Sequence, residues 1–146
     1  MLKENKGVTL VALVITFIVL LILAGVTLSM VMGDSGIFGK ANDASSKTAI
    51  SSAKDAVRLA TLEAVTDQYD NNSGTIISAK EITSDNVVSK VNEKLNNAGN
   101  DYKIATGTAG SDLAINKVNS DSTETATGVT VNFTVKSNSV TPTFNK

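Results

Sequence analysis

Residues 8–32 of the chain read VTLVALVITFIVLLILAGVTLSMVM, and no charged side chain occurs between Lys6 and Asp34. Eighteen of these twenty-five residues are Val, Ile, Leu, Phe or Met, and the others are Ala, Gly, Thr or Ser. A helix of this length rises roughly 37 Å at about 1.5 Å per residue, whereas the hydrocarbon core of a bilayer is about 30 Å thick. The segment therefore predicts a helix that can span a membrane with some tilt.

The charges that flank this apolar segment predict its orientation. Lys3, Lys6 and the terminal amine precede it against Glu4 alone, and Asp34 is the first charge after it. Because positively charged flanks stay in the cytoplasm, we expect the N terminus inside and the rest of the chain outside the cytoplasmic membrane. The apolar region of a secretory signal is usually about 7–15 residues long, so we expect this longer segment to be retained.

The junction before the apolar segment carries a second pattern, Lys6-Gly7-Val8-Thr9-Leu10, in which a charge and a glycine precede the hydrophobic run. This pattern resembles the class III signal of type IV pilins and pseudopilins. The resemblance implies a leader peptide over the first seven residues, cleavage by a prepilin peptidase after Gly7, and N-methylation of Val8. It also implies that the apolar helix later leaves the membrane and packs in the core of a helical, homo-oligomeric filament outside the cell.

The resemblance further implies which side chains would line the membrane and then the filament core. They are Val8, Leu10, Leu13, Phe17, Leu20, Leu21 and Gly25. Gly25 and Ser29 lie four residues apart, a spacing that lets helices approach closely, although ordinary lipid-facing composition accounts for these small residues as well.

One position departs from the family pattern. Most members carry Glu as the fifth residue of the mature chain, and this chain has Ala12 there. A Gram-positive-like branch of the family that lacks this Glu fits the substitution. Two interpretations remain open: a pilin that assembles without the carboxylate, or a minor subunit whose terminal amine needs no partner.

Beyond the apolar segment, the pattern predicts an α+β fold that begins with a second helix. Three glycines within 33–39 predict a bend, from which Ile37 and Phe38 are expected to pack back onto a helix or the head. Apolar residues at three- and four-residue steps predict an amphipathic helix over 40–70. Its buried stripe is expected to comprise Ile50, Ala53, Val57, Ala60 and Ala64, widened by Leu59, Leu62 and Val65.

Residues 71–146 are expected to form a small globular head. A short strand is expected over 75–78. A helix capped by Thr83 or Ser84 is expected to run to about Asn97, with Gly99 as a left-handed cap. Strands are expected over 102–106, 113–118, 129–136 and 140–144, and a Ser/Thr-rich loop over 120–127. Pro142 places the last strand at an edge. The result is a three- to four-stranded antiparallel sheet packed against the long helix.

The composition argues against catalysis. The chain has no His and no Cys, which removes imidazole bases, thiol nucleophiles, disulfides and the common zinc sites. We therefore expect no catalytic residue, metal or cofactor. After cleavage the chain would carry 11 basic and 13 acidic side chains. Because no basic patch is present, direct nucleic-acid binding is not predicted.

These observations predict a structural pilus subunit, a fimbrial protein with roles in adhesion or motility. Its partners would be its own copies, the prepilin peptidase, the pilus assembly machinery and, before assembly, the membrane. Two alternatives remain open: a pseudopilin of a type II-like secretion or competence system, and an uncleaved, signal-anchored external binding module. An anchored enzyme is the weakest rival.

Overall fold

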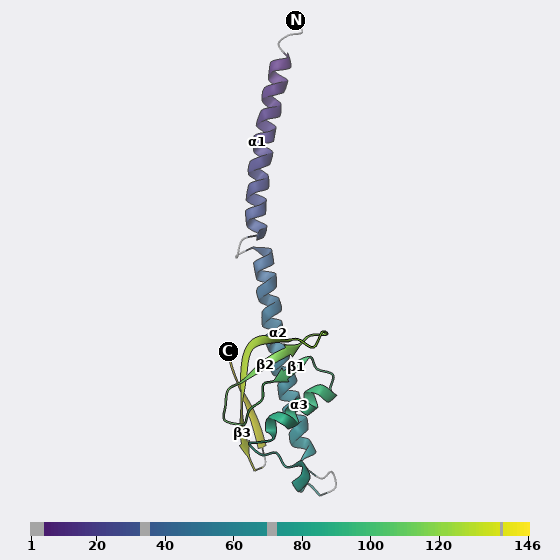
Figure 1. The fold of residues 1–146 in the computed structure, drawn as a ribbon. Helices are drawn as coiled ribbons and strands as arrows, with labels where there is room; N and C mark the ends of the chain where they lie inside the picture. Colours follow the sequence, from purple (N-terminus) through teal and green to yellow (C-terminus); the bar gives the residue numbers. More distant parts are fainter. Residues whose placement is uncertain (1–4, 33–35, 70–72, 138) are drawn as a thin grey trace. The chain divides into compact units, whose positions relative to one another are not determined.

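In the computed structural model the chain is described over residues 5–32, 36–69, 73–137 and 139–146, with the backbone alone for residues 5–8. It divides into two compact units, Met1–Ser46 and Lys47–Lys146. The first holds α1 (Asn5–Met32) and the start of α2 (Ile37–Asp67), and the second holds the rest of α2 and all later elements. Helices and one antiparallel sheet make up the fold (Figure 1), which confirms the α+β prediction.

The apolar segment forms α1, as its uninterrupted run of Val, Leu and Ile predicts. Thr16 within it donates its hydroxyl to the carbonyl oxygen of Leu13 at 2.9 Å, so the threonine satisfies its own polar group without a partner helix. Residues 1–4 of the expected leader lie outside the described residues. The helical backbone begins at Asn5, and it therefore already includes the expected cleavage position.

The last part of the bend expected over 33–39 is helical instead. Residues 33–35 lie outside the described residues, but α2 begins at Ile37, and the amide of Lys40 donates to the carbonyl oxygen of Gly36 at 3.0 Å. Residues 37–39 are therefore helical. Ile37 and Phe38 are 74% and 68% exposed, so the expectation that they pack back onto the protein was wrong.

The buried stripe of α2 follows the predicted helical steps. Its fully buried members are Ala53, Ala56, Val57, Ala60, Thr61 and Ala64, and Ile50 and Val65 are partly buried. Leu59 and Leu62 were expected to widen this stripe, but they are 62% and 63% exposed. Leu62 follows Ala53 by nine residues, which is two and a half turns at about 3.6 residues per turn, so it lies on the opposite side of the helix.

The segment between α2 and the sheet is mostly irregular. The strand expected over 75–78 is reduced to one bridge between Tyr69 and Ile76, and a short 3-10 helix, η1 (Ser78–Lys80), follows. The second expected helix appears as α3 (Val87–Asn97). Its N-cap is Asn86, two to three residues after the cap predicted at Thr83 or Ser84. Gly99 has φ +66°, so the left-handed cap predicted after α3 is confirmed.

The sheet has four antiparallel strands in the order β1-β2-β3-β4. Their bounds are β1 (Tyr102–Ile104), β2 (Leu113–Val118), β3 (Glu124–Lys136) and β4 (Ser139–Asn145). The strand β4 pairs with β3 alone, which confirms the edge position predicted from Pro142. The loop expected over 120–127 was wrong from Glu124 onward, because those residues extend β3 beside β2.

A bulge in β3 explains why the strand was predicted to begin at Val129 and not at Glu124. The register pairs Ile115 with Val129 but Asn116 with Ala126, so two extra residues of β3 lie between these pairs. Gly128 lies in this interval with φ +75°, a backbone conformation that glycine adopts without strain. The alternation that identifies Val129 onward as a strand is therefore broken at the bulge, as is usual where an extra residue enters a ladder.

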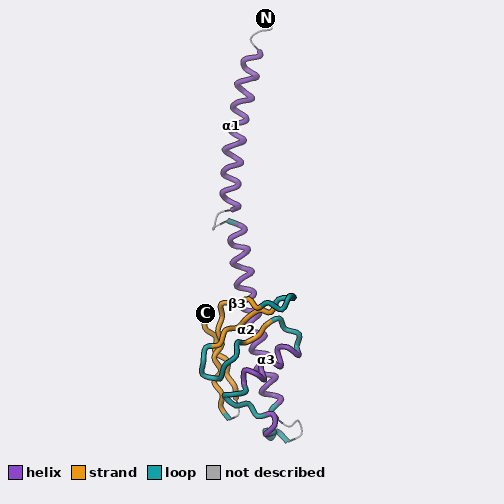
Figure 2. The backbone as a smooth tube through the Cα atoms, viewed as in Figure 1, coloured by secondary structure: helices purple, strands orange, loops and turns teal. Residues whose placement is uncertain are grey.

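One hydrophobic core joins α2, α3 and the sheet. Val129, Val131 and Phe133 on one face of β3 are at most 1% exposed, and they share this core with the buried residues of α2 and α3. The apolar face of α3 consists of Val87, Val88, Val91 and Leu95, as the sequence predicted. Figures 1 and 2 show α2 and α3 lying beside the strands, which agrees with this shared core.

Candidate functional sites

The surface of α1 is the first candidate site, because it is apolar on every side. None of its residues from Thr9 onward is buried. Leu13, Phe17 and Leu20 are 69%, 63% and 63% exposed, and Leu10 and Leu21 are similarly exposed. A helix that is apolar all round belongs inside a membrane or inside a protein assembly. This helix is long and apolar enough to cross a membrane.

The remaining predicted site residues of α1 differ in what the structure says of them. A methyl group added to Gly25 would meet no other atom within 4 Å, so the chain itself does not require glycine at this position. Gly7 and Val8 lie on the backbone of α1, and the side chain of Val8 is outside the described residues. Ala12 is exposed on the same apolar helix, where no carboxylate is present among the described residues.

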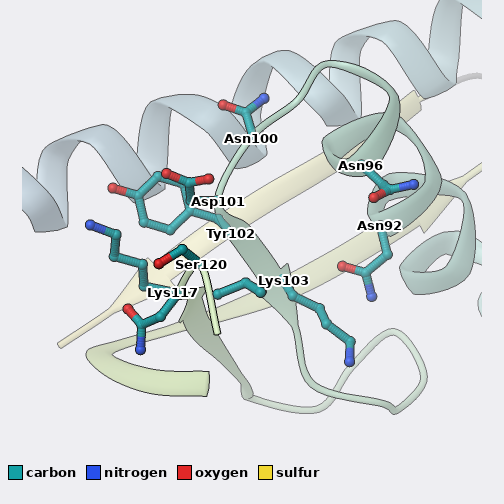
Figure 3. A pocket seen from close by; sticks show the side chains of 10 residues that line it. Asn92, Asn96, Asn100, Asp101, Tyr102, Lys103, Lys117 and Ser120 are labelled. Atoms are coloured by element: carbon teal, nitrogen blue, oxygen red, sulfur yellow. The ribbon is translucent and has the colours of Figure 1, made fainter. Parts of the chain in front are cut away.

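A polar pocket in the head is the second candidate site, and it was not predicted from the sequence. It is a hollow of about 630 Å³ beside α3, β1 and β2 (Figure 3). The lining residues are Asn92, Asn96, Asn100, Asp101, Tyr102, Lys103, Lys117, Val118, Asn119 and Ser120. All of them belong to the unit formed by residues 47–146.

Hydrogen bonds within the head fix the walls of this pocket. The amide nitrogen of Asn92 donates to the carbonyl oxygen of Ile104 at 2.9 Å, and its amide oxygen accepts from the Ile104 N–H at 2.8 Å. Asn92 thus bonds both main-chain groups of an edge-strand residue, as a neighbouring strand would. On the other side, Asn119 donates to the hydroxyl oxygens of Thr123 and Thr125, each at 2.9 Å.

The hollow also contains one ion pair that is already complete. The ammonium group of Lys103 lies 2.7 Å from a carboxylate oxygen of Glu124, whose other oxygen accepts from the amide of Asn116 at 2.9 Å. The hydrogen bond from Lys103, followed by that from Asn116, holds the pKa of Glu124 below its usual value. The positive charge of Lys103 is therefore balanced by Glu124.

Five lining residues keep their side-chain polar groups free. Asn96, Asn100, Asp101, Lys117 and Ser120 are exposed, and their side chains make no hydrogen bond or ion pair among the described residues. They come from three parts of the head: α3, the turn into β1, and the end of β2 with the turn that follows it. The structure thus brings together groups that the sequence spreads over twenty-five positions.

One sequence feature anticipates part of this pocket. Asn92 and Asn96 lie four residues apart on α3, a spacing that places their side chains on one side of the helix. From the sequence alone, Asn96–Asn100 indicate only the end of a helix. The other wall depends on the pairing of β1 with β2, which local periodicity does not reveal.

Among the described residues, no group of three His, Cys, Asp or Glu side chains is arranged to hold a metal ion. No model of a known protein family matches the sequence, and comparisons with characterised proteins and with solved structures give no match. The class that the structure itself defines is an α+β protein with a membrane-compatible apolar helix ahead of a small head.

Proposed function

We propose that this chain is the structural subunit of a type IV pilus-like filament. In this proposal a prepilin peptidase cleaves after Gly7, Val8 becomes the methylated first residue, and an assembly machine moves α1 from the membrane into the filament core. The head faces outward and forms the filament surface. The chain works by assembly and not by catalysis.

The observation that carries the proposal is the exposed apolar surface of α1. Fully burying a Val, Ile, Leu, Phe or Met side chain is favourable by about 1.5–3 kcal/mol relative to water. Eighteen such side chains lie in residues 8–32, so covering them is favourable by tens of kcal/mol as an upper bound. Monomeric soluble proteins rarely expose so large an apolar surface. Lipid covers it before assembly, and the same helix of neighbouring copies covers it afterwards.

The position of the hydrophobic core supports this proposal, because the core is formed by residues of the head. Among the residues whose burial the structure describes, every buried hydrophobic one lies between Ala53 and Phe133, in the second unit. The head also holds together without a disulfide, since the chain has no Cys. A self-sufficient head allows α1 to exchange one apolar environment for another without unfolding the rest of the chain.

The sequence before α1 distinguishes this proposal from a plain anchor. A bare anchor does not require Gly7 at the boundary between Lys6 and the apolar run, whereas the resemblance to class III signals gives that glycine a role as the cleavage position. Ala12 removes the charge that most pilins carry near the mature N terminus. Helix association would then depend on van der Waals contact between apolar side chains, as is usual for helices in lipid.

Expression with and without a prepilin peptidase, in cells that carry a pilus assembly machine, tests the proposal. Shearing the cells and imaging the released material by negative-stain electron microscopy should show filaments only when the peptidase is present. The control is the amount of full-length chain in the membrane, which should be equal or higher without the peptidase. Cleaved chain that accumulates in the membrane of peptidase-containing cells without forming filaments would contradict the proposal. Chain that keeps its leader would indicate an external binding module.

A further inference from the structure

We propose that the polar pocket beside α3 and β1 binds a neutral saccharide. The inference begins with the five free side chains, Asn96, Asn100, Asp101, Lys117 and Ser120, which line one hollow. Elsewhere on the same walls, Asn92, Lys103 and Asn119 use their polar groups in bonds within the protein. The pocket therefore combines side chains fixed by internal hydrogen bonds with unused donors and acceptors that a polar ligand can bind.

The charges of the pocket favour a ligand without net charge. The carboxylate of Asp101 and the ammonium group of Lys117 are opposite in sign, and Lys103 is compensated by Glu124. The pocket contains no Arg, the residue best suited to bidentate recognition of phosphate or carboxylate. A single carboxylate falls far short of the six or more oxygens that calcium requires.

The free groups match the hydrogen-bonding pattern of sugar hydroxyls. Each hydroxyl both donates and accepts, and so needs both kinds of partner. The amides of Asn96 and Asn100 and the hydroxyl of Ser120 supply both kinds, while Asp101 accepts and Lys117 donates. Figure 3 shows these side chains together with Asn92 around the hollow. A neutral polyhydroxyl ligand can donate to Asp101 and accept from Lys117 without bringing a charge of its own into the pocket.

Tyr102 and Val118 supply the apolar part of the same pocket. Tyr102 is partly buried against the core, and its hydroxyl lies 3.4 Å from the carbonyl oxygen of Ala49, which it approaches as a donor. An aromatic ring held in this way offers a fixed surface to the C–H groups of a sugar ring. The pocket volume lies within the range of about 300–1,000 Å³ that is typical of small-molecule sites.

Affinity for a single sugar should be weak. The free side chains are exposed, and each hydrogen bond to the ligand replaces one to water. We therefore expect dissociation constants in the millimolar range. If the chain also forms the proposed filament, many heads on one fibre would bind a glycan-coated surface together and raise the apparent affinity. The pocket itself does not depend on filament formation.

Nuclear magnetic resonance titration of the full chain tests the inference. The protein is held in lipid nanodiscs or phosphocholine micelles, because alkyl glycoside detergents carry sugar headgroups. The probes are glucose, galactose, mannose, N-acetylglucosamine, N-acetylgalactosamine and lactose. Each is added separately, up to a concentration about 50 times the millimolar dissociation constant expected of exposed polar contacts. Inorganic phosphate and Ca²⁺ are titrated in parallel. We expect saturable shifts in the side-chain amides of Asn96 and Asn100 and in the ring of Tyr102 with at least one sugar.

Matched variants locate the binding. Asn96→Ala removes a ligand hydrogen bond, and Asp101→Asn replaces a charged acceptor by a weaker neutral one. Each should weaken the binding of the sugar by about tenfold. Asn97→Ala changes the neighbouring residue of α3, and Asp85→Asn changes an exposed carboxylate away from the pocket; both should bind as the parent chain does. Unchanged backbone signals of Ile104 and Val118 show that each variant is folded.

Each of the following results would overturn the inference. No sugar in the panel saturates the pocket, or the sugar shifts residues elsewhere. Asn96→Ala and Asp101→Asn bind as tightly as Asn97→Ala and Asp85→Asn. Phosphate or Ca²⁺ occupies the pocket in place of the sugars. Because the assay uses separate chains, failure of filament assembly leaves its outcome unaffected.

Discussion

Replacing Asn92 should destabilise the head because this side chain completes the edge of β1. Its amide bonds the N–H and the carbonyl oxygen of Ile104 at 2.8 and 2.9 Å, and Ile104 is fully buried. In Asn92→Ala both main-chain groups lose their partner. A buried group left without a partner costs about 1–3 kcal/mol. Since Asn92 borders the open pocket, water can partly replace it, and we expect a total loss of about 2–4 kcal/mol.

Urea unfolding followed by tyrosine fluorescence measures this loss. The chain has two tyrosines and no tryptophan, and Tyr69 and Tyr102 both belong to the second unit, so α1 in its micelle contributes no signal. Asn97→Ala is the matched control: it makes the same substitution on α3 at an exposed position, and it should change the unfolding free energy by less than about 0.5 kcal/mol.

Hydrogen exchange at the Ile104 amide provides the second readout. In the parent chain this amide is bonded to Asn92, and we expect its protection to fall in Asn92→Ala by more than in Asn97→Ala. An Asn92→Ala head as stable as the Asn97→Ala head, with the Ile104 amide still protected, would refute the view that this side chain replaces a neighbouring strand.

Three further predictions concern stability. Lys94 lowers the pKa of Asp67 through their hydrogen bond, and Asp67 raises the pKa of Lys94; the pair should contribute about 0.2–1 kcal/mol at neutral pH. This contribution should disappear as pH falls through the lowered pKa of Asp67 or rises through the raised pKa of Lys94. In urea titrations, Asp67→Asn should abolish the loss of stability that the pair causes at low pH and at high pH. Val57→Ala should lower the free energy of unfolding by about 2–3 kcal/mol, and Leu62→Ala should lower it by less than about 0.5 kcal/mol. Equal losses of this free energy in calorimetry would mean that Leu62 is buried. Gly99→Ala should cost about 1–2 kcal/mol because of its positive φ, and no change in thermal unfolding would contradict the left-handed cap.

Local pattern predicted the elements whose environment is simple. The alternation from Val129 onward identified the buried face of β3, and the missing N–H of Pro142 placed β4 at an edge. The run of apolar residues identified α1. Each of these features has a single kind of environment along its length. Because that environment determines which residue types are favoured, the residue types indicate the environment.

The errors arose where tertiary packing selects among similar residues. Leu59 and Leu62 are as hydrophobic as any core residue, but α2 buries its alanine-rich side, including Ala53, Ala60 and Ala64. Small side chains allow a helix to lie close to the elements it covers, and they leave the larger leucines outside. Hydrophobicity alone does not distinguish these two faces, since the helical step places apolar residues on both.

The polar pocket could not be derived from the sequence for a related reason. Its free side chains belong to α3, to the turn after it, and to the end of β2 with the turn that follows. The pairing of β1 with β2, which includes Tyr102 and Lys117, brings them together. Asparagine in a turn is common for conformational reasons, so each residue taken alone indicated a loop. Their convergence is a property of the folded head.

The mature N terminus of protein sheared from cells tests the central claim most directly. Peptide mass spectrometry of the filament fraction should find a chain that begins at N-methylated Val8 and lacks the first seven residues. A sheared fraction that begins at Met1, with residues 1–7 intact ahead of the apolar helix, would contradict processing and with it the transfer of α1 from lipid into a filament.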